Sequence, residues 1–358
     1  MKFLWTGLVW LCDVESVKTK SVAIALAVGA LVTPLSAAAL PAQTAPETDL
    51  KDALSITSTV ESDVIQPVLE DNVALSYKPD SAVVAEATIN ASEVSIPLNP
   101  ADGVTYGDIT IGLPTSSAAE DAQSVQPGVV GYDDEQFSVA VALKSSADLQ
   151  FSTVVSDASA PTRFDYELTL PSGAELSLGA NGSAWAIGAD SEFLLGVESP
   201  WAVDANGQEV PTHFEVHGHT LTQVVDHSSG SYAYPIVADP YAGRNIFDRV
   251  TTYQPHKDQV DLVLSSWGRA IQLGQMSGDP STGWAKGQQI LQKNGWDEAV
   301  ARGANVLNTK ATYRHQYDCH RVGAYTPYTG GTAWNLEGWR APKANWLSDN
   351  PQRHKCNW

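Results

Sequence analysis

The C-terminal end of the sequence contains four kinds of side chain that take part in catalysis or binding: thiol, imidazole, carboxylate and guanidinium. The stretch contains the pair Cys319-His320, Glu337 in a Trp-Asn-Leu-Glu run, Arg340 and Cys356. An imidazole oriented by a carboxylate can act as a general base, so His320 and Glu337 are the candidate catalytic residues. The alternative is structural: Glu337 pairs with the guanidinium of Arg340, and the groups form a packed, hydrogen-bonded knot.

The same stretch is rich in tryptophan. Seven of the eleven tryptophans of the chain lie from Trp267 onward. Large rings fill a thin core and leave some of their edges at the surface, where aromatic and arginine side chains favour binding. The candidate binding residues are Trp334, Asn335, Trp339 and Arg340.

Residues 1–39 have the pattern of a secretory signal peptide. Lys18 and Lys20 form a basic edge, residues 21–35 are apolar and uncharged, and three alanines end at Ala39, where we expect cleavage. The apolar run is too short for a comfortable membrane span, although an uncleaved anchor is the alternative. We therefore expect a secreted, extracellular or cell-wall-associated protein with no membrane span after cleavage.

The chain has three cysteines, and Cys12 lies in the segment that we expect to be removed. Cys319 and Cys356 remain as an even pair, which favours a disulfide in an exported protein. A nucleophilic Cys319 beside His320 is the alternative, but side chains adjacent in sequence are rarely placed for proton transfer.

The charge of the chain is divided unevenly. Residues 1–240 contain 7 Lys and Arg against 32 Asp and Glu, whereas residues 241–358 contain 14 against 9, which together give the formal net charge of −20. An acidic surface repels a polyphosphate, so we expect no nucleic-acid partner. The mild basic excess of the second half suits contact with an anionic surface, or with the acidic half itself.

Composition and periodicity divide the remaining chain into three parts. Residues 40–95 are rich in Ala, Ser, Thr and acidic residues, which predicts a flexible acidic linker with a short helix near Ala53–Leu69. Residues 96–242 contain short alternating runs, such as Phe137–Leu143 and Arg163–Thr169, separated by turn signals that include Asn181-Gly182. This pattern predicts a mainly β domain, an antiparallel β-sandwich.

Residues 243–358 predict a small α+β domain closed by one disulfide. Residues Gln259–Leu264 alternate as a strand, and Ser265 or Ser266 could cap a following short helix. Two helical pieces, Gly283–Lys293 and Trp296–Ala301, flank Gly295, and the rest predicts short strands and long loops.

The histidines of the β domain are of a residue type that binds metal ions. His213, His217, His219 and His227 lie close together in sequence, but no third ligand stands at a spacing typical of zinc enzymes. The turn of Asp204 to Gly207 lacks the other ligands of a calcium loop. We therefore expect no metal and no cofactor.

The Cys319-His320 pair, the run from Trp334 to Glu337 and the pair Trp339-Arg340 resemble a C-terminal domain of unknown function found in secreted actinobacterial proteins. The resemblance covers roughly the last third of the chain and is sharpest over residues 313–343. The run before it, with Pro200-Trp201-Ala202, Val225-Asp226-His227 and Tyr234-Pro235, resembles a β-rich module found upstream of varied C-terminal domains. These resemblances imply that the first half of the chain carries or presents the second half. They imply no particular reaction.

Two functions remain open. The first is a non-catalytic binding or interaction protein whose C-terminal domain contacts a cell-envelope component or an extracellular protein. The second is a secreted effector, a small hydrolase or bactericidal toxin domain, with His320 and Glu337 as its acid/base pair. Geometry distinguishes them: an enzyme requires these two side chains in hydrogen-bond reach at an open cleft.

Overall fold

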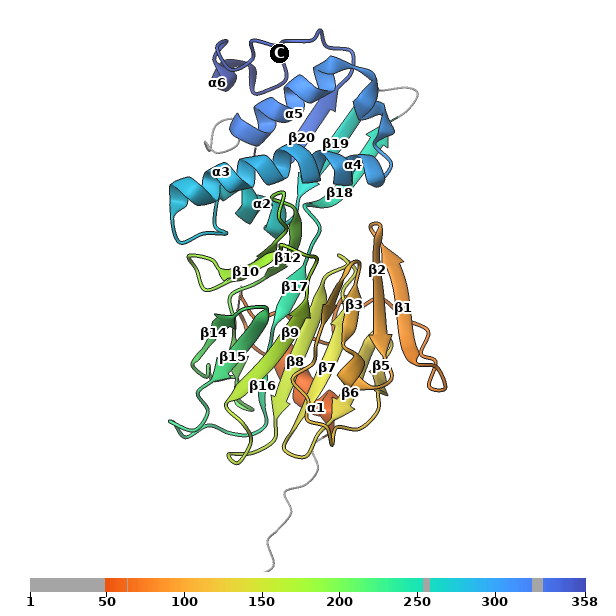
Figure 1. Cartoon of the computed structure of the whole chain (residues 1–358), viewed down its shortest axis with the longest axis vertical. Coiled ribbons are helices and arrows are strands. Elements are labelled where there is room, and N and C mark those ends of the chain that lie inside the picture. Colours follow the sequence, from red (N-terminus) through yellow and green to blue (C-terminus); the bar gives the residue numbers. More distant parts are fainter. Residues whose placement is uncertain (1–48, 63, 254–257, 324–330) are drawn as a thin grey trace, which may run out of the picture. The chain divides into compact units, whose positions relative to one another are not determined.

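The computed structural model describes residues 49–62, 64–253, 258–323 and 331–358, so the expected signal segment lies outside the described residues. Glu47–Trp358 form one compact unit. This unit consists mostly of antiparallel sheets, with most of its helices in the C-terminal region (Figure 1).

The first sheet has seven strands, all paired antiparallel, in the order β1-β2-β3-β4-β9-β15-β14. Its strands are β1 (Val83–Ile89), β2 (Ser92–Pro97), β3 (Val104–Tyr106), β4 (Ile109–Ile111), β9 (Arg163–Thr169), β14 (Thr212–His217) and β15 (Thr220–Val225). Along β9 buried and exposed residues alternate without exception, as the sequence predicts for a strand with one face in water.

The second sheet has ten strands, in the order β10-β11-β12-β17-β8-β7-β6-β5, with β16 joined to β8 and β13 joined to β16. Its strands are β5 (Gln123–Gln126), β6 (Val129–Asp133), β7 (Phe137–Leu143), β8 (Leu149–Val155), β10 (Glu175–Leu178), β11 (Ala184–Ile187), β12 (Phe193–Val197), β13 (Ala202–Val203), β16 (Ile236–Ala238) and β17 (Tyr241–Gly243). The predicted turn at Asn181-Gly182 joins β10 to β11, and Gly182 has the positive φ of 83° that such a turn needs.

The largest apolar core draws its side chains from both sheets. Phe137 and Phe151 of the second sheet meet Phe164 and Tyr166 of the first, with ring centroids 5.3 and 5.9 Å apart. The rings meet edge to face, an arrangement that aromatic pairs favour.

The segment before β1 differs from the flexible linker that we expected for residues 40–95. It contains α1 (Leu50–Ser55) and the short helix η1 (Ile56–Ser58), and Leu54 packs in one cluster with Ala140 of β7. The ammonium of buried Lys144 donates to the carbonyls of Pro67, Val68 and Glu70 at 2.8–3.0 Å. The segment covers the face of β7 that the sequence left to solvent, so both faces of that strand are buried.

The C-terminal region begins with a three-stranded sheet of β18 (Phe247–Tyr253), β19 (Gln259–Leu264) and β20 (Ala333–Glu337). Helices follow in the order α2 (Ser266–Leu273), α3 (Pro280–Ile290), η3 (Leu291–Gly295), α4 (Trp296–Ala301), η4 (Asn305–Thr309), α5 (Ala311–Gly323) and α6 (Pro351–His354); one further short helix, η2 (Pro100–Asp102), lies in the β-rich region. Strand β19 and the Ser265 cap of α2 are confirmed, and the hydroxyl of Ser265 accepts from the N–H of Gly268 at 3.0 Å.

A shared apolar core joins the C-terminal region to the β-rich region. Trp267 of α2 lies edge-on to Trp185 of β11 at 6.0 Å and donates its indole N–H to Asp148 at 3.2 Å. A Cβ on Gly196 would lie 2.4 Å from the ring of Trp267, so the strand must carry glycine there. The boundary that we expected between residues 242 and 243 therefore does not divide two compact units.

Among the described residues, no helix is long and apolar enough to cross a membrane.

Candidate functional site

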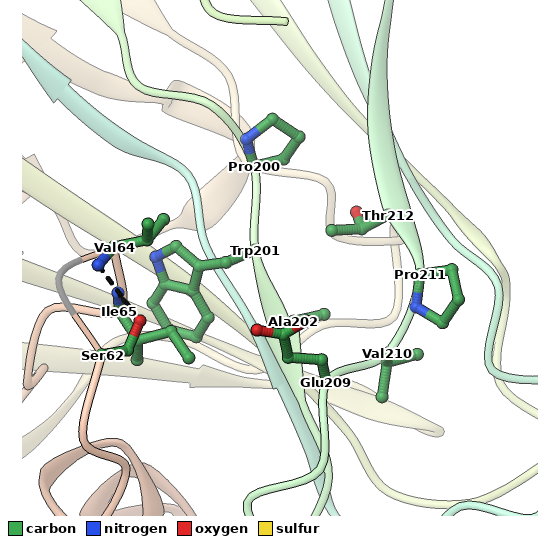
Figure 2. A pocket seen from close by; sticks show the side chains of 10 residues that line it. All are labelled: Ser62, Val64, Ile65, Pro200, Trp201, Ala202, Glu209, Val210, Pro211 and Thr212. Atoms are coloured by element: carbon green, nitrogen blue, oxygen red, sulfur yellow. Dashed lines mark hydrogen bonds between the residues drawn. The ribbon is translucent and has the colours of Figure 1, made fainter. Parts of the chain in front are cut away.

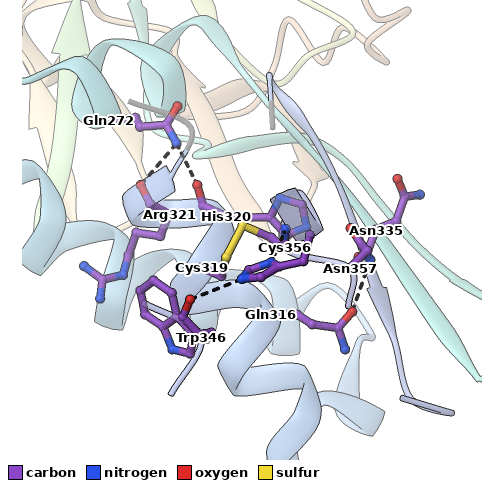
Figure 3. Close-up of a disulfide and its surroundings, with 10 residues drawn as sticks. Gln272, Gln316, Cys319, His320, Arg321, Asn335, Trp346, Cys356 and Asn357 are labelled. Carbon is purple, nitrogen blue, oxygen red and sulfur yellow. Dashed lines mark hydrogen bonds between the residues drawn. A yellow bond between two sulfur atoms is a disulfide. The ribbon is translucent and has the colours of Figure 1, made fainter. Parts of the chain in front are cut away.

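A disulfide joins Cys319, near the end of α5, to Cys356, just after α6 (Figure 3). Their Cα atoms are 5.4 Å apart across 37 positions of sequence, and both residues are fully buried. The predicted disulfide is confirmed. A cysteine in a disulfide has no thiolate, so Cys319 is not a nucleophile in this state.

His320 is buried, with 3% of its surface exposed. Its ring stacks on the indole of Trp334, with centroids 5.9 Å apart and planes 11° from parallel. Neither ring nitrogen makes a hydrogen bond of normal geometry, although Asn357 and the backbone of Asn335 lie near the ring. Burial penalises the charged ring and lowers the pKa of His320 to about 4, which leaves the ring neutral at pH 7.

Glu337 makes its side-chain contacts with Arg340 and Asn357, and not with His320. Its carboxylate pairs with the guanidinium of Arg340 and accepts from the amide of Asn357 at 3.3 Å. Among the hydrogen bonds of the described residues, none joins His320 to Glu337. Successive residues of a strand face opposite sides, so Trp334, which meets His320, and Glu337, three positions later, point away from each other.

Two amide side chains hold the end of β20 in place. The buried side chain of Gln316 donates to the carbonyl of Glu337 and accepts from its N–H, both at 2.9 Å. The amide of Asn357 donates to the carbonyl of Asn335 at 2.7 Å. These contacts resemble those of a neighbouring strand, so they satisfy the outer edge of β20. The result is the hydrogen-bonded knot that was the alternative to a catalytic pair.

The four candidate binding residues lie in different environments. Trp334 is buried, because it occupies an inward position of β20 and packs edge-on against Phe247 and Tyr317. Asn335 is exposed and donates to Asp261 at 2.6 Å. Trp339 leaves 55% of its surface exposed. The structure thus places Trp339 at the surface and removes Trp334 from any binding face.

We name as the tail surface four exposed side chains from the last part of the chain: Trp339, Leu347, Arg353 and Lys355. Leu347 leaves 63% of its surface exposed, the largest fraction among the large apolar side chains of the described residues. Residues 338–358 contain four Lys and Arg against one acidic residue, Asp349. An apolar and cationic surface of this kind is suited to an anionic partner.

Contacts within the tail hold this surface to the rest of the region. The guanidinium of Arg340 donates to the carbonyl of Trp358, and the Trp358 indole donates to the carbonyl of Ala341 at 2.8 Å. The N–H of Lys343 donates to Nδ1 of His315 on α5 at 2.9 Å. Together with the disulfide, these bonds order the segment that carries the exposed side chains.

The histidines of β14 form a row with Glu215 between them. His213 lies 3.4 Å and His217 lies 3.6 Å from its carboxylate, and Arg163 donates to the same carboxylate at 2.7 Å. His227 instead bonds to Tyr234 at 2.9 Å. Among the described residues, no group of three or more potential ligands is suited to hold a metal ion.

Sequence reasoning missed two features of this region. Helix α5, which carries Cys319 and His320, was expected as loop or short strand, although Tyr313, Tyr317 and His320 stand at helical spacing and are all buried. The role of Asn357 gave no signal in sequence, because its three partners come from α5 and β20.

A comparison of the chain with protein-family models finds no match, and a comparison with curated proteins finds none either. The resemblance to a C-terminal domain of secreted proteins therefore stays a prediction.

Proposed function

We propose that the protein is a secreted or envelope-associated binding protein, and that its tail surface binds an anionic component of the cell envelope. The observation that carries this proposal is the exposure of two large apolar side chains, Trp339 and Leu347, and of two cations, Arg353 and Lys355, within one ordered segment of the chain. Ordering the segment before binding lowers the entropy lost on binding, which favours recognition by a few large side chains.

The surroundings of His320 support a non-catalytic function. A general base must reach the proton that it abstracts, and its pKa should lie near the working pH. The ring of His320 is buried against Trp334, its pKa lies at about 4, and Glu337 is paired with Arg340. The effector hypothesis depends on an accessible acid/base pair, and this geometry does not favour it.

In this proposal the first half of the chain acts as a carrier. Its two antiparallel sheets, which share the largest apolar core, would form a β-sandwich that presents the C-terminal region. The strongly acidic balance of residues 1–240 would keep this half from an anionic envelope, so the more basic half would make the contact.

Co-sedimentation of the full-length protein with insoluble envelope material of an actinobacterium tests the proposal. We expect the double variant Trp339→Ala/Leu347→Ala to bind about ten-fold more weakly, since truncation of a central aromatic anchor costs roughly 1–2 kcal/mol. The double variant Arg353→Gln/Lys355→Gln should bind more weakly and lose part of the salt dependence of the wild type.

Two substitutions in the β-rich region serve as matched controls. Leu178 is also an exposed leucine, and Lys51 is also an exposed lysine. Leu178→Ala and Lys51→Gln should bind like the wild type. Equal binding by the tail variants, or equal losses in the controls, would show that the tail surface is not the contact.

A further inference from the structure

A cavity of about 390 Å³ lies in the β-rich region (Figure 2). Its apolar wall is formed by Val64, Ile65, Trp201 and Val210, and Glu209 and Thr212 add polar groups. Cavities of this size hold small molecules or single side chains of a peptide. Val64 leaves 51% of its surface exposed, which is unusual for an apolar residue of a closed core.

Trp201 provides an unused hydrogen-bond donor in this cavity. The ring as a whole is 6% exposed, and the indole N–H makes no hydrogen bond to another described residue. Figure 2 shows the ring reaching toward Val64 and Ile65. This N–H is not among the buried, unpaired polar atoms of the described residues, so it is open to solvent and can donate to the carbonyl of an apolar ligand.

The walls of the cavity are held in position before any ligand binds. The backbone N–H of Trp201 donates to buried Asp239 at 2.9 Å, and its carbonyl accepts from Gln223 at 3.3 Å. Across the cavity, the hydroxyl of Ser62 accepts from the N–H groups of Val64 and Ile65 at 3.1 and 3.2 Å. A site with fixed walls loses little entropy when it binds.

The charge near the cavity favours a cationic ligand. Glu209 lines the cavity and is exposed. The half of the chain that contains it, residues 1–240, has 32 Asp and Glu against 7 Lys and Arg. The potential of such a surface raises the local concentration of cations and repels anions.

We propose that this cavity binds a short peptide in which an apolar side chain is followed by a basic one. The apolar side chain fills the space between Trp201 and Val64, the peptide carbonyl accepts from the indole N–H, and the ammonium pairs with Glu209. This site is separate from the tail surface, and the proposal does not depend on the function assigned to that surface.

Nuclear magnetic resonance of the indole N–H groups tests the proposal in the full-length, ¹⁵N-labelled protein. The probe is N-acetyl-valyl-lysine amide, and the Trp201 signal is identified as the one that Trp201→Phe removes. We expect this signal to shift saturably with the probe. N-acetyl-valyl-glutamine amide should bind about two- to five-fold more weakly, the range for an exposed ion pair.

Glu209→Gln makes the test independent of any loss of folding in Trp201→Phe, because Glu209 is exposed. In Glu209→Gln the two probes should bind equally. The proposal is overturned if the Trp201 signal does not shift at millimolar probe, or if Glu209→Gln keeps the preference for lysine.

Discussion

Asp239 in the β-rich region and His320 in the C-terminal region are both ionisable and both buried, but the two regions accommodate them differently. One carboxylate oxygen of Asp239 accepts from the backbone of Trp201 and the amide of Gln223 at 2.9 and 3.0 Å, whereas the other has no partner. His320 has no hydrogen bond at either nitrogen and stacks on Trp334.

Burial favours the neutral form of both groups, and this has opposite consequences for their protons. Burial raises the pKa of Asp239 well above its ordinary value and lowers that of His320 to about 4. Folding therefore favours a bound proton on Asp239 and a lost proton on His320. Asp239 should therefore lower the free energy of unfolding as the pH rises, whereas His320 should lower it as the pH falls.

Removal of the disulfide should have the largest effect on stability, because this bond closes the segment around His320. We expect Cys319→Ala/Cys356→Ala to lower the free energy of unfolding by about 3–4 kcal/mol, the chain-entropy value for a closure of this length. Urea unfolding measures the loss. A change well under 1 kcal/mol would mean that the tail packs equally well without its covalent link.

Acid should destabilise the protein through His320. In the unfolded chain the ring takes up a proton below a pH of about 6.5, whereas in the folded protein it stays neutral down to a pH of about 4. The free energy of unfolding therefore falls over this window. The full loss amounts to about 3 kcal/mol. His320→Leu should remove it, which urea unfolding between pH 4 and pH 7 would measure.

The difference between variant and wild type isolates His320 from other groups that titrate in this window. Glu198 is one of these, since burial raises its pKa to about 7. If the two proteins lose stability in parallel as the pH falls, His320 is protonated without cost and the comparison fails.

The local sequence pattern correctly predicts those strands and helix starts that depend only on residues close together in the sequence. The alternation of β9, the strand β19 and the Ser265 cap of α2 all follow from side-chain periodicity or capping chemistry. The disulfide followed from counting cysteines in a chain expected to be exported. Each of these predictions needed only a few adjacent residues or a simple pairing rule.

What the sequence did not predict depends on contacts between distant segments. The burial of Ala140 results from α1, which lies far away in sequence, and that contact replaces the expected linker with an ordered segment. Trp334 and Trp339 look alike in sequence, yet one is core and the other surface, because the strand β20 packs against α5. The cavity at Trp201 likewise needs two segments that no periodicity joins.

Substitution of Gln316 tests whether the hydrogen bonds at the end of β20 stabilise the C-terminal region. In Gln316→Leu the N–H and carbonyl of Glu337 lose their partners, so we expect a loss of about 2 kcal/mol in the free energy of unfolding. Hydrogen exchange at the amide of Glu337 should become faster. Gln289→Leu, at an exposed glutamine of α3, is the matched control and should change little.

Near pH 4, Asp239→Asn should have the smallest effect on stability, and its pH dependence tests how burial acts on Asp239. An amide keeps the oxygen that accepts from Trp201 and Gln223, so near pH 4, where wild-type Asp239 is protonated, we expect a change of less than about 1 kcal/mol. As the pH rises, the unfolded wild-type chain releases a proton that folded Asp239 retains, which lowers the free energy of unfolding of the wild type alone. The variant should therefore gain on the wild type from pH 4 toward pH 7, opposite in direction to the pH dependence that His320 produces. A constant difference across that range would mean that Asp239 is ionised in the folded protein, with its charge held by the two hydrogen bonds.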